Sequence, residues 1–146
     1  DKVKHKSDFI LMLEQAGLRE HAFGLYAQSG CLLLRLKHEK ILDKIDIDKP
    51  KVYKGLDTTI LNYLILKPIL NLDLHDKNII YTNDAEEAID LVDAHQGAYA
   101  FLLNPVKIDE VKRIALLDER MPPKSTFFYP KLLSGLVVNK FNEDTS

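Results

Sequence analysis

The 146-residue sequence has one cysteine, no tryptophan and only two methionines. Its single thiol, Cys31, cannot form an internal disulfide and excludes a zinc site built from cysteines. No apolar run approaches the roughly 18 residues that a membrane-spanning helix needs. The five histidines are scattered, with no two spaced to share one helix face, so the sequence predicts no metal site.

A strong excess of either charge is also absent. There are 20 Lys and Arg against 22 Asp and Glu, for a net charge of −2. Nucleic-acid-binding domains carry a basic excess, so we expect no nucleic-acid partner, and we expect no membrane partner. No signal peptide is visible, which makes the cytoplasm the default location. The chain begins with Asp1 rather than Met, and we expect it to be part of a longer protein.

The N-terminal half alternates helix and hairpin signals. Ser7 and Gly17 bracket an apolar helical stripe as a helix cap and a helix end. Two apolar runs, 21–27 and 31–37, flank turn-forming residues and predict a β-hairpin. A well-buried helix is expected from Asp57 or Thr58 to about Leu66, with Pro68 ending or kinking it.

The next segment predicts a strand-helix-strand unit. Residues 78–82 and 98–103 read as strands, and residues 84–96 read as a helix opened by an Asp84–Glu87 capping box. Because 98–103 is almost wholly apolar, we expect it in the centre of a covered sheet, parallel to 78–82. A second helix should follow Pro105. The last expected strands are Thr126–Tyr129 and Gly135–Phe141.

Together these patterns predict an α+β fold over one domain, residues 1–146. Its sheet should be mixed and contain five or six strands with packed helices. We expect it to include a right-handed strand-helix-strand crossover as well as the hairpin.

A proline- and hydroxyl-rich stretch, residues 121–132, is the most unusual part of the sequence. Its prolines restrict the backbone on both sides of a cation and two hydroxyls, which favours a preorganised site for a carboxylate or phosphate. The candidate ligand-binding residues here are Lys124, Ser125, Thr126, Tyr129 and Lys131.

The alternative for this stretch is a turn between a helix and a strand whose exposed polar residues bind no ligand. A true phosphate loop is excluded because Pro122 and Pro123 lack the backbone N–H groups that wrap the anion. Asn104 is the remaining candidate: it follows an expected strand and precedes a helix, where anions collect. It could equally be the cap of that helix, with Pro105 in its first position.

Other polar residues have ordinary explanations. Asp57 and the Glu86-Glu87 pair lie in first helical turns, where carboxylates are stabilised by the helix dipole. His21 and His38 flank the hairpin and could face each other. No pair of nucleophile and base can be recognised.

Several segments resemble an uncharacterised prokaryotic family, "domain of unknown function 1015". The segments are Leu102-Leu-Asn-Pro105, Met121-Pro-Pro-Lys-Ser-Thr126 and Phe128-Tyr-Pro-Lys-Leu-Leu-Ser-Gly-Leu-Val137, with His21-Ala-Phe-Gly-Leu-Tyr26, Leu56-Asp57, Leu64-Ile-Leu66 and Pro68-Ile-Leu70. The resemblance spans about Phe9 to Val138 and covers the C-terminal half of longer members. Members often carry His where Asn62 stands, which weakens any catalytic role transferred to that helix.

The resemblance implies an N-terminal domain that this chain lacks, bearing an Asp-Gly-His-His-Arg-type motif. That motif is similar to those of ParB/sulfiredoxin-like domains, some of which are nucleotide-using enzymes. We therefore expect an accessory domain that binds a small anionic metabolite, without a complete active site. Two alternatives stay open: a domain that contributes residues to a phosphotransferase acting on a small amino acid or similar metabolite, and a structural domain that forms a homodimer.

Overall fold

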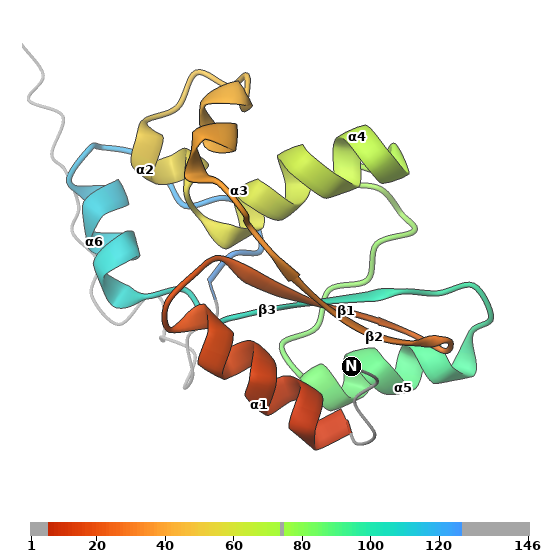
Figure 1. The fold of residues 1–146 in the computed structure, drawn as a ribbon. Helices are drawn as coiled ribbons and strands as arrows, with labels where there is room; N and C mark the ends of the chain where they lie inside the picture. The colour runs from red at the N-terminus through yellow and green to blue at the C-terminus, as the bar shows by residue number, and fades with distance from the viewer. Residues whose placement is uncertain (1–5, 74, 127–146) are drawn as a thin grey trace, which may run out of the picture.

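The computed structural model describes residues 6–73 and 75–126. Within them the chain is an α+β fold in which helices cover both faces of a three-stranded sheet (Figure 1). The sheet order is β2-β1-β3, and both pairings are antiparallel. The strands are β1 (Ala22–Ala27), β2 (Gly30–Arg35) and β3 (Ala100–Leu103). The longer helices are α1 (Lys6–Gly17), α5 (Ala85–Ala94) and α6 (Ile108–Ala115).

The predicted hairpin is confirmed. Strands β1 and β2 pair with Ala27 opposite Gly30, so Gln28 and Ser29 form the connecting turn. Gly30 has φ 139°, a value that residues with a side chain rarely adopt. The helix before the hairpin begins by Lys6, so Ser7 lies inside it rather than capping it.

The predicted five- to six-stranded mixed sheet with a parallel crossover is wrong. Strand β3 runs antiparallel to β1, with Phe23 opposite Leu103, and within the described residues it pairs with β1 alone. In this part of the chain β3 is therefore an edge strand and β1 is central. The last expected strands, Thr126–Tyr129 and Gly135–Phe141, lie outside the described residues except for Thr126. The apolar character of residues 98–103 reflects cover by helices on both faces, which does not require a strand on each side.

The expected strand at 78–82 is also absent from the structure. Its first two backbone N–H groups bond locally instead: Asn78 N–H donates to Asp76 Oδ1 over 2.8 Å, and Ile79 N–H donates to the Asp76 carbonyl over 3.0 Å. The Thr82 hydroxyl donates to Glu87 and accepts from the Asp84 N–H. Such local side-chain bonds compete with a strand ladder. The helix that follows is confirmed as α5, and Asp84 caps it by accepting from the N–H groups of Glu86 and Glu87.

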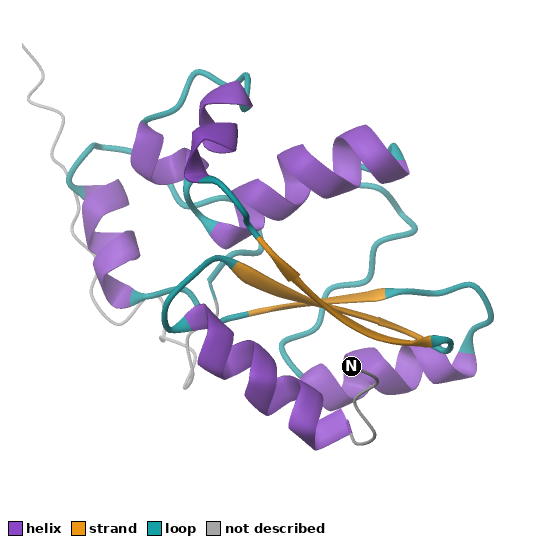
Figure 2. Ribbon diagram, viewed as in Figure 1, coloured by secondary structure: helices purple, strands orange, loops and turns teal. Residues whose placement is uncertain are grey.

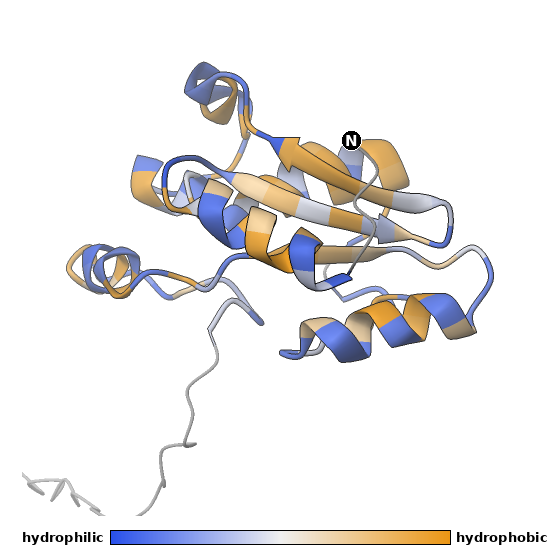
Figure 3. Cartoon of the chain, turned by 60° about the horizontal axis from the view of Figure 1, so that its bottom comes forward, coloured by the Kyte–Doolittle hydropathy of each residue, from blue (hydrophilic) through white to orange (hydrophobic). Residues whose placement is uncertain are grey.

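Two hydrophobic clusters lie on opposite faces of the sheet. Along β3, Ala100 and Leu102 belong to one cluster and Phe101 and Leu103 to the other, as alternation along a strand requires. Helices α1 and α5 cover the first cluster, and both carry bands of hydrophobic and hydrophilic residues (Figure 3). The buried members of the second cluster are Phe23, Leu42, Ile45, Ile60, Leu61 and Leu66.

Short helices cover the second face of the sheet. They are the 3-10 helix η1 (Glu39–Lys44), α2 (Lys51–Lys54), α3 (Asp57–Leu61), the π-helical segment η2 (Asn62–Leu66) and α4 (Lys67–Leu70). The last three run on without a break, and Figure 2 shows them among the helices above the sheet. Pro68 does not end this helix. It lacks the N–H that would bond to Leu64, and a wider π turn just before it accommodates the proline ring.

Candidate functional site

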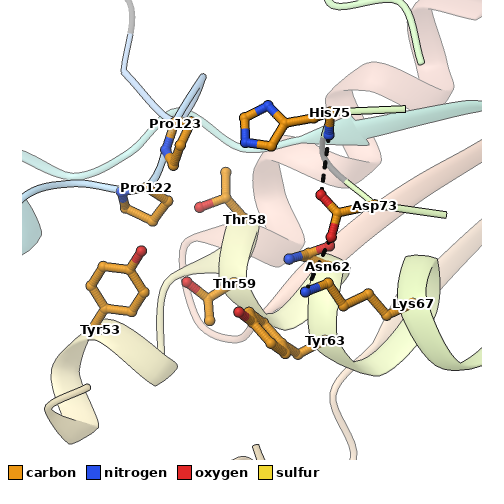
Figure 4. A pocket seen from close by; sticks show the side chains of 10 residues that line it. All are labelled: Tyr53, Thr58, Thr59, Asn62, Tyr63, Lys67, Asp73, His75, Pro122 and Pro123. Atoms are coloured by element: carbon orange, nitrogen blue, oxygen red, sulfur yellow. Dashed lines mark hydrogen bonds and ion pairs between the residues drawn. The ribbon is translucent and has the colours of Figure 1, made fainter. Parts of the chain in front are cut away.

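A hollow of about 220 Å³ lies between the helix of residues 57–70 and the Pro122-Pro123 pair (Figure 4). We call it the threonine hollow. Figure 4 shows the side chains of Thr58, Thr59 and Asn62 along its helical wall. The described residues that line it are Tyr53, Thr58, Thr59, Asn62, Tyr63, Lys67, Asp73, His75, Pro122 and Pro123.

The helical wall is the deepest part of this hollow, and we call it the floor. It contains polar atoms without partners. Thr58 Oγ1, Thr59 Oγ1 and Asn62 Oδ1 are enclosed, and none makes a hydrogen bond to any described residue. Thr59 and Asn62 are each only 2% exposed. A buried, unpaired polar group costs about 1–3 kcal/mol, and most folded proteins avoid it. Three such atoms around one hollow indicate a surface shaped for a polar ligand.

The π turn places a cation beside this floor. The backbone N–H of Lys67 donates to the carbonyl of Asn62, five residues earlier, instead of the four-residue step of an α-helix. The two residues therefore lie one turn apart on the same side of the helix. Pro68 is the local cause, so the sequence feature that was expected to kink the helix also positions Lys67.

The rim of the hollow carries one charge of each sign. Lys67 Nζ lies 3.3 Å from Asp73 Oδ2 and 4.6 Å from the centre of the Tyr63 ring. The N–H of His75 donates to Asp73 Oδ1, and this bond, followed by Lys67, lowers the pKa of Asp73 below its ordinary value. Asp73 is consequently a carboxylate at neutral pH.

The described part of the predicted proline-rich stretch contributes Pro122 and Pro123 to the opposite wall. Pro122 is buried, and its carbonyl accepts from the Ser125 hydroxyl over 2.6 Å and from the Ser125 N–H over 3.3 Å. Residues 122–125 are therefore a tight turn. Lys124 has φ 60°, the left-handed region, and its side chain is exposed.

The four predicted ligand-binding residues that the structure describes, Asn104, Lys124, Ser125 and Thr126, are not brought together in one hollow. Ser125 has its hydroxyl bonded within the turn, and Lys124 and Thr126 are exposed and line neither hollow described here. Tyr129 and Lys131 lie outside the described residues. Whether any of them binds a ligand stays a prediction.

Asn104 lines a different hollow of about 210 Å³, which we call the histidine hollow. Its lining residues are Gly17, Leu18, Arg19, Glu20, His21, Leu36, Glu39, Asp57, Asn104, Pro105, Val106, Lys107 and Glu110. Asn104 does not cap α6. Lys107 precedes that helix, and its N–H donates to Glu110. The Asn104 amide instead donates to the carbonyl of Ala22 over 3.3 Å, which is a structural bond.

His21, just before β1, and Asp57, the first residue of α3, form an ion pair in the histidine hollow. His21 Nδ1 lies 2.7 Å from Asp57 Oδ1, and both side chains are about three-quarters buried, at 27% and 21% exposure. The hydrogen bond to Asp57 raises the pKa of His21, against an opposing effect of burial. The described lining of this hollow carries four acidic residues, and its basic residues besides His21 are Arg19 and Lys107. Its charge therefore does not favour the anion expected beside Asn104. The acidic residues are Glu20, Glu39, Asp57 and Glu110.

Sequence reasoning missed the floor of the threonine hollow. The helix over residues 57–66 was expected to be well buried because of its apolar stripe. The polar residues between the apolar positions were not predicted to bind a ligand. A usable signal was present: Asn62 is an amide in a buried helix, and a buried amide needs a partner. His21 and Asp57 were likewise noted separately, 36 residues apart in sequence, with nothing to indicate their pairing.

The described residues contain neither a cluster of metal-binding side chains nor a helix able to cross a membrane. No three His, Cys, Asp or Glu side chains gather there as metal ligands would. In the same residues, the helices are too short or too polar to cross a bilayer.

Comparisons with known proteins add no relative. No protein-family model, no curated protein and no solved structure matches the chain. The resemblance to the family of unknown function therefore stays a prediction.

Proposed function

We propose that this chain is a small-ligand-binding domain and that the ligand occupies the threonine hollow. The observation that carries the proposal is the set of three enclosed side-chain oxygens without partners, on Thr58, Thr59 and Asn62. Isolated unpaired groups occur in native structures, but three on one wall of one cavity form a surface complementary to hydrogen-bonding groups. A ligand that supplies those bonds recovers their desolvation cost when it binds.

The ligand carries an anionic group. Lys67 is a cation on the rim and can pair with a carboxylate or phosphate, while the floor hydroxyls can donate to other polar groups of the same ligand. Asn62 can donate too, because rotating its amide exchanges nitrogen for oxygen. The site thus serves the small anionic metabolite expected from the sequence, although through different residues.

Binding rather than catalysis fits this arrangement. Neither Thr58 nor Thr59 hydrogen-bonds to a base in the described residues, which an activated hydroxyl nucleophile would need. Within the resemblance to the family of unknown function, the chain would then be an accessory domain that presents a ligand to an N-terminal domain. We propose that role, and a homodimer has no comparable observation in its favour.

Calorimetric titration of the chain with small carboxylates and with phosphate tests the proposal. We expect saturable binding of at least one of them and its loss in Asn62→Leu, which keeps the branched shape of the side chain and removes its amide. Thr126→Val is the matched control, because Thr126 is an exposed hydroxyl in the stretch first predicted to bind. Binding that survives Asn62→Leu and is lost in Thr126→Val would move the site to the turn and reject the threonine hollow.

A further inference from the structure

We propose that the ligand of the threonine hollow is a small hydroxycarboxylate. Its carboxylate pairs with Lys67 at the rim, and its hydroxyl forms hydrogen bonds with Thr59 and Asn62 on the floor. Asp73 is the residue that selects against anions of higher charge. This inference rests on the proposed binding function and goes further by naming the ligand class.

Burial separates the hollow into a charged rim and an uncharged floor. The side chains of Lys67 and Asp73 are 40% and 58% exposed, whereas Thr59 and Asn62 are 2% exposed. Placing an ion deep among neutral groups carries a large desolvation cost, while a neutral hydroxyl enters at little cost if it forms hydrogen bonds. The charge of the ligand therefore belongs at the rim, and a neutral polar group belongs on the floor.

The floor atoms specify a group that both donates and accepts. Asn62 Oδ1 can only accept, so as oriented it needs a donor, and a carboxylate offers none. Turned by half a rotation, the same amide presents donors and needs an acceptor. A hydroxyl satisfies either orientation and also pairs with the hydroxyl of Thr59. An ammonium group would satisfy only the first orientation, and it would bring a charge to the floor.

Asp73 limits the charge that the rim accepts. Asp73 Oδ2 lies 3.3 Å from Lys67 Nζ and pairs with it. Asp73 is ionised, because the hydrogen bond from the backbone N–H of His75 and the Lys67 side chain lower its pKa. A monoanion can share Lys67 with Asp73. A second negative charge on the ligand would face the Asp73 carboxylate, and the described residues that line the hollow include no further lysine or arginine. Asp73 thereby disfavours phosphate.

The volume of the hollow favours a small acid. It measures about 220 Å³. Such a space fits a hydroxy acid of about two to four carbon atoms and is smaller than the ~300–1,000 Å³ of drug-sized pockets.

The test compares glycolate, acetate, glycine and phosphate by calorimetric titration of the chain at neutral pH. We expect glycolate to bind at least about fivefold more tightly than acetate, the factor for one hydrogen bond to an otherwise unpaired group. Lys67→Met should abolish glycolate binding. Asp73→Asn should improve phosphate binding at least about fivefold and change the glycolate affinity far less. Asp109→Asn is the matched control, because it removes the same charge from an exposed position outside the hollow.

The possible failures are distinguishable. If none of the four probes binds, both the proposed function and this inference are rejected. If acetate or glycine binds as tightly as glycolate, or Asp73→Asn changes phosphate and glycolate binding equally, the ligand class is wrong and the binding function stands. Equal effects of Asp73→Asn and Asp109→Asn would show that net charge alone, and not the position of Asp73, sets the selectivity.

Discussion

The side chain of Asn104 lies directly against the α-carbon of Gly17, so that a β-carbon on Gly17 would overlap the Asn104 amide. That amide donates to the carbonyl of Ala22, and Lys107 Nζ donates to the carbonyl of Gly17 over 3.3 Å. The end of α1, the start of β1 and the segment after β3 are thereby tied together. Gly17 is needed for this close approach and not for a left-handed turn, since its φ is not positive.

Gly17→Ala should destabilise the chain by about 1–3 kcal/mol, the usual cost of overpacking a filled site. Urea unfolding followed by circular dichroism measures it. The control is the double variant with Asn104→Ala, which removes the overlapping amide. If the two changes interact through this contact, the double variant will be more stable than the sum of the single losses predicts. Strict additivity would contradict the contact.

The His21–Asp57 pair should make stability depend on pH. Hydrogen bonding to Asp57 raises the pKa of folded His21 above its ordinary value of 6.5. The stabilisation is therefore fully present below that ordinary value and is lost as the pH rises through the raised one. Urea unfolding between about pH 5.5 and about pH 8.5 should show this decline. His21→Gln should flatten it, and an unchanged slope would rule out the pair as its source.

Lys124→Gly should stabilise the chain. Lys124 adopts φ 60°, which costs a residue with a β-carbon about 1–2 kcal/mol relative to ordinary backbone conformations. Glycine avoids most of that cost but has a more disordered unfolded state, so the net gain should be about 0.5–1 kcal/mol. A rise in the thermal midpoint checks this. A fall would show that the lysine side chain contributes interactions that outweigh the strain.

Phe9→Ala should cost about 3–5 kcal/mol, because Phe9 is 1% exposed in the cluster under α1 and α5. Phe101→Ala should cost less, since Phe101 is only partly buried at the edge of the opposite cluster. Chemical denaturation of the two variants ranks them. The reverse order would place the main core on the face of the sheet covered by α3 and η2.

Local elements could be predicted from the sequence, and their pairing could not. The hairpin of β1 and β2 and the cap of α5 at Asp84 follow from turn and capping chemistry that acts over a few residues. The antiparallel pairing of β3 with β1 joins residues more than 70 positions apart, and both parallel and antiparallel partners fit the same apolar run. The bonds that remove the expected strand at 78–82 depend on side-chain geometry that hydrophobic patterning does not record.

The candidate site was predictable only in part. Pro122 and Pro123 line a hollow, whereas the sequence predicted a site at the polar residues beside them. Of these, Ser125 bonds within the turn and Lys124 and Thr126 are exposed. The floor could not be predicted, because it requires that the side-chain oxygens of Thr58, Thr59 and Asn62 have no hydrogen-bond partner among the described residues of the folded chain. That depends on how the whole fold packs. The position of Lys67 depends on a π turn, in which one residue more than in an α-helix lies between hydrogen-bonded groups. Apart from Pro68, nothing in the sequence indicates such a turn.

The most direct test of the central claim is the free energy of unfolding of Thr59→Val, measured without ligand and compared with glycolate binding by the same variant. Valine keeps the shape of threonine and removes the hydroxyl. If that hydroxyl serves a ligand and no part of the fold, the variant should be as stable as the parent or up to about 2 kcal/mol more stable, and it should bind glycolate much more weakly. A loss of stability above about 1 kcal/mol, with glycolate binding unchanged, would show that Thr59 has a structural partner and would contradict the account.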